Sequence, residues 1–180
     1  MSDEMDYMEQ AKELADSYRL LVHRRDMLRQ QYEDSRSWFY TKDEIIYKLS
    51  QGAYEESERV QTSGTSNPVE RTVLNCDKVL ASMNREVQTQ RTEQFLEPYY
   101  KVCEDIELFE VGLRSLRGCT RIVAEQLFVD GRKHSEITGL DGRILSRRVV
   151  EREKETALQG IADVIRLHDR HRRGECGKTD

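Results

Sequence analysis

Apolar side chains recur along the first part of the chain at alternating spacings of three and four residues, which marks one face of an α-helix. The first stripe consists of Ala11, Leu14, Tyr18, Leu21, Leu28 and Tyr32, and is interrupted by Arg25. Acidic residues come early in this segment and arginines come later, which suits the dipole of a helix. The pattern predicts a helix from about residue 4 to about residue 34.

Two further stripes of the same kind follow. The first comprises Val69, Val73, Cys76, Leu80, Met83 and Val87, and the second comprises Tyr99, Val102, Ile106, Phe109, Leu113 and Leu116. Each helix is apolar on one side only and must bury that side against another helix. An antiparallel hairpin or bundle within one chain and a self-associating coiled coil satisfy this requirement equally well.

The connections between these helices carry their own signals. A run of Ser, Thr, Gly and Asn at about residues 61–68 predicts a loop. At its end, Asn67, Pro68 and Glu70 suit the N-cap, the first and the third position of a new helix. Pro98 predicts a break or a kink.

The aromatic residues Trp38, Phe39 and Tyr40 permit two interpretations. They could stack on nucleic-acid bases, or they could pack at a helix turn. Acidic residues dominate their surroundings, which favours packing.

The last 69 residues follow a different pattern, because they hold eight of the ten glycines and no proline. Glycine marks turns and helix ends, so this part should contain shorter elements. The residues predict a short apolar helix near 122–128, a turn at Asp130–Gly131, a short segment at 135–138 and a second turn at 139–142. A longer helix is then expected from Arg143 to about His168.

The expected last helix carries Arg143, Arg147, Arg148 and Arg152 near its start. A short helix that leads through a glycine turn into an arginine-bearing helix is typical of a helix-turn-helix. Arginine suits DNA because its planar fork can bind a guanine edge or bridge phosphates. Glu151, Glu153 and Glu155 favour the other interpretation, a solvated helix with internal ion pairs.

Charge separates the chain in the same way. Residues 1–113 carry 14 basic and 23 acidic side chains, a net charge of −9, whereas residues 114–173 carry 14 basic and 9 acidic ones, a net charge of +5. The whole chain has a net charge of −5. We therefore expect an all-α protein with an acidic helical arm at 1–113, a basic domain at 114–173 and a disordered tail at 174–180.

Several classes of protein are not expected. No run approaches the ~18 apolar residues of a membrane span, and the acidic first twenty residues do not resemble a signal peptide. Four separate cysteines without a CxxC pair indicate reduced thiols in a cytoplasmic protein. Phosphate-binding, hydrolase and zinc motifs are missing, and His168, His171 and Cys176 match no zinc spacing. We expect no catalytic site, metal or cofactor.

Two segments of the chain resemble a known family. The run RIVAEQLFVDGRKHSEITGLDGRILSRRVVEREKETALQGI at residues 121–161 resembles the helix-turn-helix of sigma-70 region 4. The run ERVQTSGTSNPVERTVLN at 58–75 resembles the linker of small phage-associated sigma-70-like proteins of Gram-positive bacteria. The resemblance implies a regulator of phage or prophage transcription, with late genes as its expected targets.

The resemblance also implies roles for individual residues. Glu136, Ile137 and Thr138 match the helix that braces the recognition helix, and Val149, Ala157 and Leu158 match its core face. Phosphate contacts are implied for Arg132, Lys133 and His134. Groove contacts are implied for Arg143, Ser146, Arg147 and Arg148, and the neighbouring Arg152 is a further expected DNA contact. Gly142 stands where the family continues into Ser or Tyr-Ser, which leaves the start of the recognition helix open by about two residues.

The sequence therefore predicts a DNA-binding transcription regulator whose partner is double-stranded DNA. The arm would form a homodimer or contact RNA polymerase, and no membrane is involved. Nothing resembles a region that recognises a −10 element, so an autonomous sigma factor is not expected. The alternatives are a helical interaction or oligomerisation protein without DNA binding, and the small subunit of a phage DNA-packaging terminase.

Overall fold

The computed structural model describes residues 2–57 and 68–174, and the side chains of residues 7–49 and 76–174. The fold is all-α, because helical segments make up most of the described residues and β pairing among them is limited to an isolated bridge between Thr138 and Ile144. The expected loop at about 61–68, the expected caps Asn67 and Glu70, and the tail from residue 175 lie outside the described residues or side chains.

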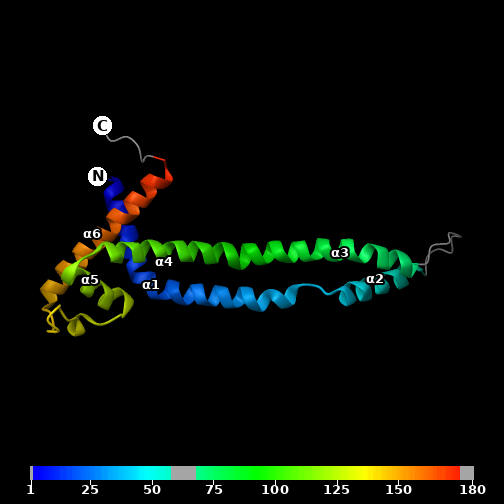
Figure 1. The fold of residues 1–180 in the computed structure, drawn as a ribbon, viewed down its shortest axis with the longest axis horizontal. Helices are drawn as coiled ribbons and strands as arrows, with labels where there is room; N and C mark the ends of the chain where they lie inside the picture. Colours follow the sequence, from blue (N-terminus) through cyan, green and yellow to red (C-terminus); the bar gives the residue numbers. More distant parts are fainter. Residues whose placement is uncertain (1, 58–67, 175–180) are drawn as a thin grey trace. The chain divides into compact units, whose positions relative to one another are not determined.

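Figure 1 shows the helices of the described residues. In chain order they are α1 (Ser2–Asp34), η1 (Ser35–Trp38), α2 (Lys42–Ser57), α3 (Pro68–Arg91), η2 (Thr92–Leu96), α4 (Glu97–Ser115), α5 (Gly118–Ala124), η3 (Glu125–Val129), η4 (His134–Glu136) and α6 (Arg147–Arg172). Helix α1 confirms the prediction for residues 4–34, and α3 begins at Pro68 as expected. None of the described helices combines the length and the apolar character that a membrane span requires.

Helix α3 continues into α4 through η2, which is a single π-helical turn. In this turn the N–H of Glu97 donates to the carbonyl of Thr92, five residues earlier. Pro98 follows directly and has no N–H to donate, so a regular helix would lose a hydrogen bond there. The predicted break or kink at Pro98 thus coincides with a π turn, which lets the helix continue.

The chain forms two compact units, each of which is described by itself. One unit comprises Met1–Met27 with Tyr100–Asp180, and the other comprises Leu28–Tyr99. The sequence-based boundary after residue 113 follows a different division. We call the first unit the head and the second the insert, because the insert lies between the two segments of the head along the chain.

In the insert, α2 and α3 pack side by side and run antiparallel (Figure 1). The order of their contacts shows this direction, because Lys42 pairs with Asp77 at 2.9 Å whereas Tyr40, earlier in the chain, pairs with Asn84, later in the chain. The Asn84 side-chain amide accepts a hydrogen bond from the Tyr40 backbone N–H at 2.8 Å and donates one to the Tyr40 carbonyl at 3.1 Å. The segment between η1 and α2 is thereby fixed to α3.

The aromatic cluster also lies in the insert, where it packs at a helix turn. The rings of Trp38 and Phe95 are 5.6 Å apart, and the ring of Phe39 lies 4.7 Å from the guanidinium of Arg91. Cys76 is fully buried, as the stripe predicted. These contacts agree with the packing interpretation of the cluster.

Arg91 is a buried cation in the insert, with only 3% of its surface exposed. Its guanidinium donates to the hydroxyl of Ser35 at 2.7 Å and to the carbonyl of Tyr32 at 2.9 Å, and it lies over the Tyr32 ring at 4.3 Å. The carbonyl belongs to the last turn of α1, where the helix dipole is negative and favours a cation. Arg91 therefore caps the C-terminal end of α1.

The core of the head is formed by α1, α4, η3 and α6. The Phe109 ring lies 4.7 Å from the Tyr18 ring and 6.1 Å from the Phe128 ring, so three separate segments meet at one aromatic cluster. Gly112 of α4 faces Ile161 of α6, and a Cβ on this glycine would be 3.0 Å from the nearest isoleucine atom. The core depends on this close approach between the two helices.

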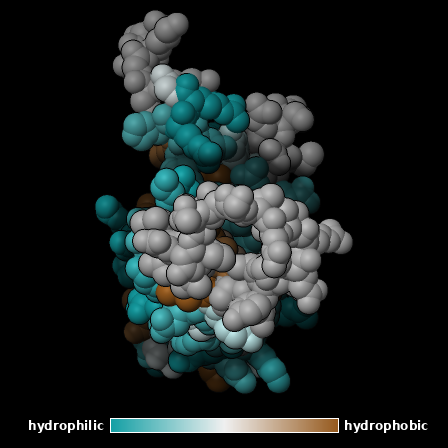
Figure 2. Space-filling model, turned by 90° about the vertical axis from the view of Figure 1, so that its right-hand side faces the viewer, coloured by the Kyte–Doolittle hydropathy of each residue, from teal (hydrophilic) through white to brown (hydrophobic). Residues whose placement is uncertain are grey.

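Figure 2 shows a face on which hydrophilic side chains predominate and hydrophobic ones are scattered. This distribution agrees with the mean hydropathy of −0.80.

Candidate nucleic-acid interface

The last helix begins later than the sequence predicted. Helix α6 starts at Arg147, so the expected start at Arg143 is wrong, and Arg143 and Ser146 precede the helix. Ser146 has an extended backbone, and its carbonyl accepts the first helical bonds, from Val149 at 2.9 Å and Val150 at 3.0 Å. The residues before it are extended because Leu145 donates its N–H to the Ile137 carbonyl at 2.9 Å. This pairing also lets Leu145 pack against the core cluster of the buried Val123, Ile137 and Val150.

The bracing helix expected around Glu136, Ile137 and Thr138 is also wrong in form. The structure has a single 3₁₀ turn, η4, at His134–Glu136. Ile137 follows with an extended backbone and a fully buried side chain. Three residues are too few for an α-helical turn with its own hydrogen bonds, so burial of Ile137 decides the local conformation.

The predicted turn at Gly139–Gly142 is confirmed as the end of a short hairpin. Gly139 donates its N–H to the Arg143 carbonyl at 2.9 Å, and Gly142 donates to the Gly139 carbonyl at 3.0 Å. Gly142 has a φ of +73°, the left-handed conformation that follows a type I turn in a three-residue hairpin loop. We call residues Thr138–Ile144 the hairpin.

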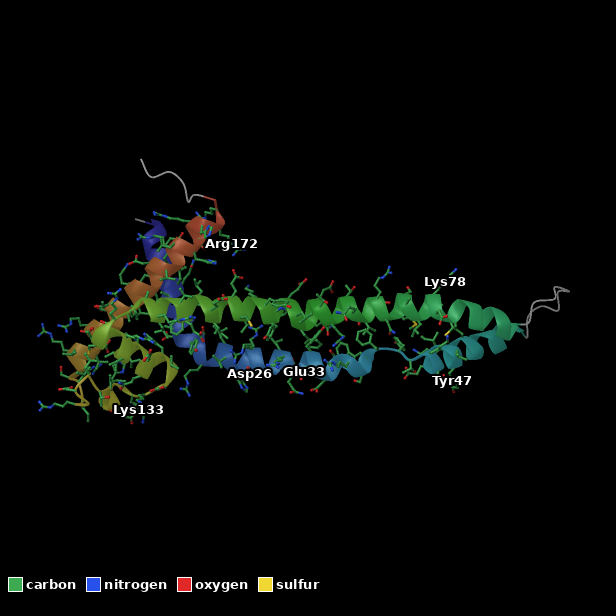
Figure 3. All side chains as sticks on the ribbon, in the orientation of Figure 1. Asp26, Glu33, Tyr47, Lys78, Lys133 and Arg172 are labelled. Carbon is green, nitrogen blue, oxygen red and sulfur yellow. The ribbon has the colours of Figure 1, made fainter. Side chains whose placement is uncertain are left out.

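A hollow of about 390 Å³ lies between η4 and the start of α6. Its lining consists of Lys133, His134, Ser135, Leu145 and Arg147. Three expected DNA contacts, Lys133, His134 and Arg147, therefore meet at one place. Ser135 and Leu145 were not expected at this place, although Ser135 directly follows a predicted phosphate contact. In Figure 3 the labelled Lys133 lies in the segment that leads into η4.

Arg147 and Arg148 occupy the first turn of α6, which contains no acidic residue. The N-terminal end of a helix carries a partial positive charge, so two arginines there are disfavoured by the helix itself. Both are exposed, and within the described part of the chain neither side chain has an ion pair or a hydrogen bond. An anion bound at this end would be stabilised by the helix dipole and by both guanidinium groups.

The other expected cations are engaged with nearby carboxylates. Arg132 lies 3.3 Å from Asp130, Arg143 lies 3.7 Å from Asp141, and Arg152 lies 2.8 Å from Glu153. The first two pairs are largely exposed, and exposed pairs contribute little to stability. Arg152 thus follows the ion-pair interpretation of the sequence, although its side chain stays 71% exposed.

His134 of η4 lies beside α6. Its Nε2 lies 3.1 Å from the Glu151 carboxylate of α6. This nitrogen is buried and makes no hydrogen bond within the described structure. His134 therefore brings a polar atom without a hydrogen-bond partner to the edge of the hollow.

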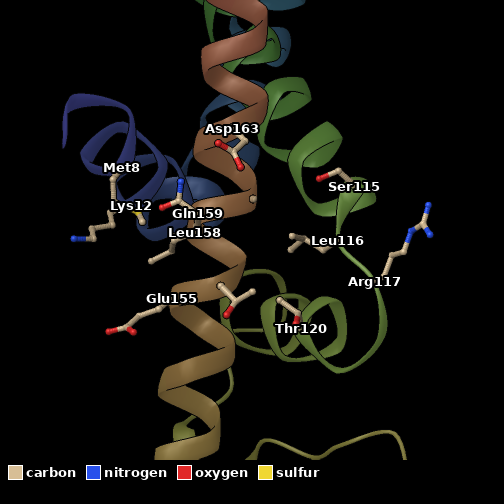
Figure 4. A pocket seen from close by; sticks show the side chains of 12 residues that line it. Met8, Lys12, Ser115, Leu116, Arg117, Thr120, Glu155, Leu158, Gln159 and Asp163 are labelled. Atoms are coloured by element: carbon tan, nitrogen blue, oxygen red, sulfur yellow. The ribbon is translucent and has the colours of Figure 1, made fainter. Parts of the chain in front are cut away.

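A larger groove of about 870 Å³ lies elsewhere in the head (Figure 4). The side chains around it come from α1, the end of α4, α5 and α6, and include Lys12, Arg117, Glu155 and Asp163. Its charges are mixed in sign, and it contains none of the residues expected to bind DNA. Among the described residues, no group of three or more His, Cys, Asp or Glu side chains is arranged to hold a metal ion.

Comparison of the chain with protein-family models, curated proteins and solved structures found no match.

Proposed function

We propose that the protein binds double-stranded DNA through the end of the head that contains the hairpin, the hollow and the start of α6, and that it regulates transcription. The observation that carries this proposal is the pair Arg147 and Arg148, which have no partner in the described structure and lie at a helix N-terminus beside the cationic hollow. Binding of polyanionic DNA would offset the unfavourable placement of two arginines at a helix N-terminus.

The dimensions of α6 suit the major groove. An α-helix with its side chains is about 10–12 Å wide, and the major groove of B-DNA is about 12 Å wide. The first turn of α6 would present Arg147 and Arg148 to base edges, with Arg152 one turn further along. Lys133 and His134 would contact phosphates from the hollow, with Arg132 beside them, and Arg143 and Ser146 would flank the entering helix.

The resemblance to sigma-70 region 4 agrees with this placement. On that basis we propose that the module is a divergent helix-turn-helix, whose bracing helix is reduced to η4, and that its targets are phage or prophage late genes. The alternatives without DNA binding predict no role for the partnerless arginines.

The helices of the arm would join two copies of the chain or contact RNA polymerase. Leu20 and Met27 of α1 are 68% and 47% exposed and stand seven residues apart, which is one heptad. A homodimer would place two copies of α6 on half-sites separated by whole turns of DNA. A ring larger than a dimer, measured by light scattering, would instead favour the terminase small subunit.

The proposal is tested by binding of the full chain to sheared genomic DNA over a range of salt concentrations. Two variants are compared, Arg147→Ala/Arg148→Ala and the matched Arg170→Ala/Arg173→Ala, which removes the same charge from exposed positions at the other end of α6. The Arg147→Ala/Arg148→Ala variant should bind more weakly, because it removes two cations from the DNA-binding end. Each of them that neutralises a phosphate contributes about one unit to the salt slope, which a base contact does not.

The control variant should bind almost as the unmodified protein does. Circular dichroism verifies that both variants stay helical. Absence of binding at low salt, or an equal loss of affinity in the two variants, would overturn the proposal.

A further inference from the structure

The hairpin exposes two large aliphatic side chains next to the proposed DNA-binding end of the head. Leu140 is 72% exposed and Ile144 is 68% exposed, whereas the adjacent Leu145 turns inward against the core. Arg143, between them in the sequence, has a side chain that is 88% exposed. Single exposed apolar residues are ordinary, but two of them flanking an arginine on one short hairpin form a distinct surface.

This surface is held firmly in place. The backbone bonds of Gly139 with Arg143 and of Leu145 with Ile137 close the hairpin at 2.9 Å each. The buried Gln126 of η3 accepts from the Thr138 N–H at 2.9 Å and donates to the Thr138 carbonyl at 3.0 Å. The fixed backbone therefore imposes the exposure of Leu140 and Ile144. The tip of the hairpin can bind a partner without the entropic cost of first becoming ordered.

The charge around the tip selects the class of partner. Arg147 and Arg148 begin α6 three residues after the hairpin ends, and Figure 1 shows the hairpin and the start of α6 at the same end of the head. The only carboxylate within the hairpin is Asp141, which accepts the backbone N–H of Arg143 at 3.2 Å and lies 3.7 Å from the Arg143 guanidinium. Aliphatic side chains surrounded by arginines match a groove of nucleic acid, with its apolar sugar walls and its phosphates.

We propose that the hairpin enters the minor groove next to the major groove that α6 occupies, with Arg143 pointing into the groove and Leu140 and Ile144 against its walls. A single arginine side chain that projects from the end of the hairpin is narrow enough for a minor groove about 6 Å wide, whereas a helix about 10–12 Å wide is not. Arginine is attracted to the negative potential of a narrow minor groove, and apolar side chains can press between base steps there. This inference rests on the proposed function and adds a second point of contact to it.

The test uses base analogues that alter one groove at a time. A duplex of about three helical turns carries either G·C or inosine·C pairs at its centre, and inosine removes only the amino group in the minor groove. A second pair of duplexes carries thymine or uracil, which removes only the methyl group in the major groove. Affinities of the full chain for all four duplexes are measured at low salt.

The intact protein should bind the inosine duplex roughly fivefold more tightly than the G·C duplex, because the groove becomes narrower and loses its protruding amino group. Arg143→Ala and Leu140→Ser/Ile144→Ser should each abolish this preference while measurable binding remains. Leu167→Ser, a matched change at a 60% exposed leucine of α6, should preserve it.

The possible failures are distinguishable. Equal binding to the inosine and G·C duplexes, or a preference for thymine over uracil that the hairpin variants remove, would overturn the minor-groove contact and leave the proposed function standing. Absence of binding to every duplex at low salt would overturn both proposals.

Discussion

The hydroxyl of Thr120 donates a hydrogen bond of 2.6 Å to Oε2 of Glu153, and this bond joins α5 to α6. The other carboxylate oxygen accepts from the guanidinium of Arg152 at 2.8 Å. The Glu153 side chain is only 13% exposed. The hydrogen bond from Thr120, followed by that from Arg152, lowers the pKa of Glu153 below its ordinary value of 4.5. The charged carboxylate is therefore part of the contact that positions α6.

Thr120→Val should lower the stability of the head at neutral pH by about 1–2 kcal/mol, because it removes a hydrogen bond to a charged group. A lowered pKa in the folded state gives stability that is present above the unfolded pKa and is lost as the pH falls through the folded one. The difference between variant and unmodified protein should therefore shrink below about pH 4. Urea denaturation at neutral and at acid pH measures this difference in the free energy of unfolding.

Thr156→Val serves as the control for this prediction. The Thr156 hydroxyl bonds only to the Arg152 carbonyl of its own helix, at 2.9 Å, and does not touch Glu153. Its effect on stability should be small and independent of pH. If the effect of Thr120→Val were equally independent of pH, the link between this hydroxyl and the charge of Glu153 would be wrong.

Gln126→Leu should destabilise the hairpin more than the rest of the head. The substitution keeps the size of the side chain but leaves the Thr138 N–H and carbonyl without their partner, and each unsatisfied group costs about 1–3 kcal/mol. The amide of Thr138 should then exchange with solvent faster, and DNA binding should weaken through loss of a fixed tip. Gln159→Leu, which makes the same substitution at an exposed position of α6, serves as the control variant. Equal protection of the Thr138 amide in both variants would contradict the prediction.

Two glycines at the contact between α4 and α6 should respond differently to substitution by alanine. A Cβ at Gly112 would meet the branched side chain and the backbone Cα of Ile161 at 3.0–3.3 Å, whereas a Cβ at Gly160 would meet only the end of the Leu116 side chain. Alanine favours a helix by about 1 kcal/mol over glycine. Gly160→Ala should therefore be nearly neutral and Gly112→Ala destabilising, as thermal denaturation can show. The opposite order would show that Ile161 adapts more easily than Leu116.

Arg91→Leu should lower the stability of the insert by several kcal/mol, because it removes two hydrogen bonds from a buried cation, to the Ser35 hydroxyl and the Tyr32 carbonyl, which then keep only the 2.7 Å bond between each other. Arg91→Lys should recover only part of this loss, since a lysine cannot reproduce the planar fork or its stacking on two rings. Denaturation monitored by the fluorescence of Trp38, the one tryptophan, reports on the insert. Identical stability of the two variants would exclude the geometric role of the guanidinium.

The long helices could be predicted from the sequence because their signals are local. The stripe from Ala11 to Tyr32 repeats over about six turns, and Pro68 marks a helix start that its fixed φ favours. Cys76 lies on the second stripe and is buried, as expected. Each of these features depends on neighbours within a few turns of the same helix.

The candidate interface was harder to predict because its backbone follows contacts between distant residues. Ile144 and Leu145 precede Arg147 with no proline or glycine between, so the arginine run suggested one continuous helix. Pairing of Leu145 with Ile137 delays the helix by four residues, and Ser146, a residue type common at N-caps, was the available signal. The contribution of Gln126 had no counterpart in any motif.

The division of the head between the two ends of the chain has a consequence for protein synthesis. Residues 1–27 leave the ribosome first, but the partner of Tyr18 in the core, Phe109, lies beyond residue 100. At about 5–20 residues per second, translation of the intervening insert takes roughly 4–14 seconds. During this time the insert can fold alone, because it is one continuous segment of the chain. The apolar face of the first helix meanwhile has no partner to pack against. Nascent chains arrested before residue 100 should therefore bind to chaperones that recognise exposed apolar helices.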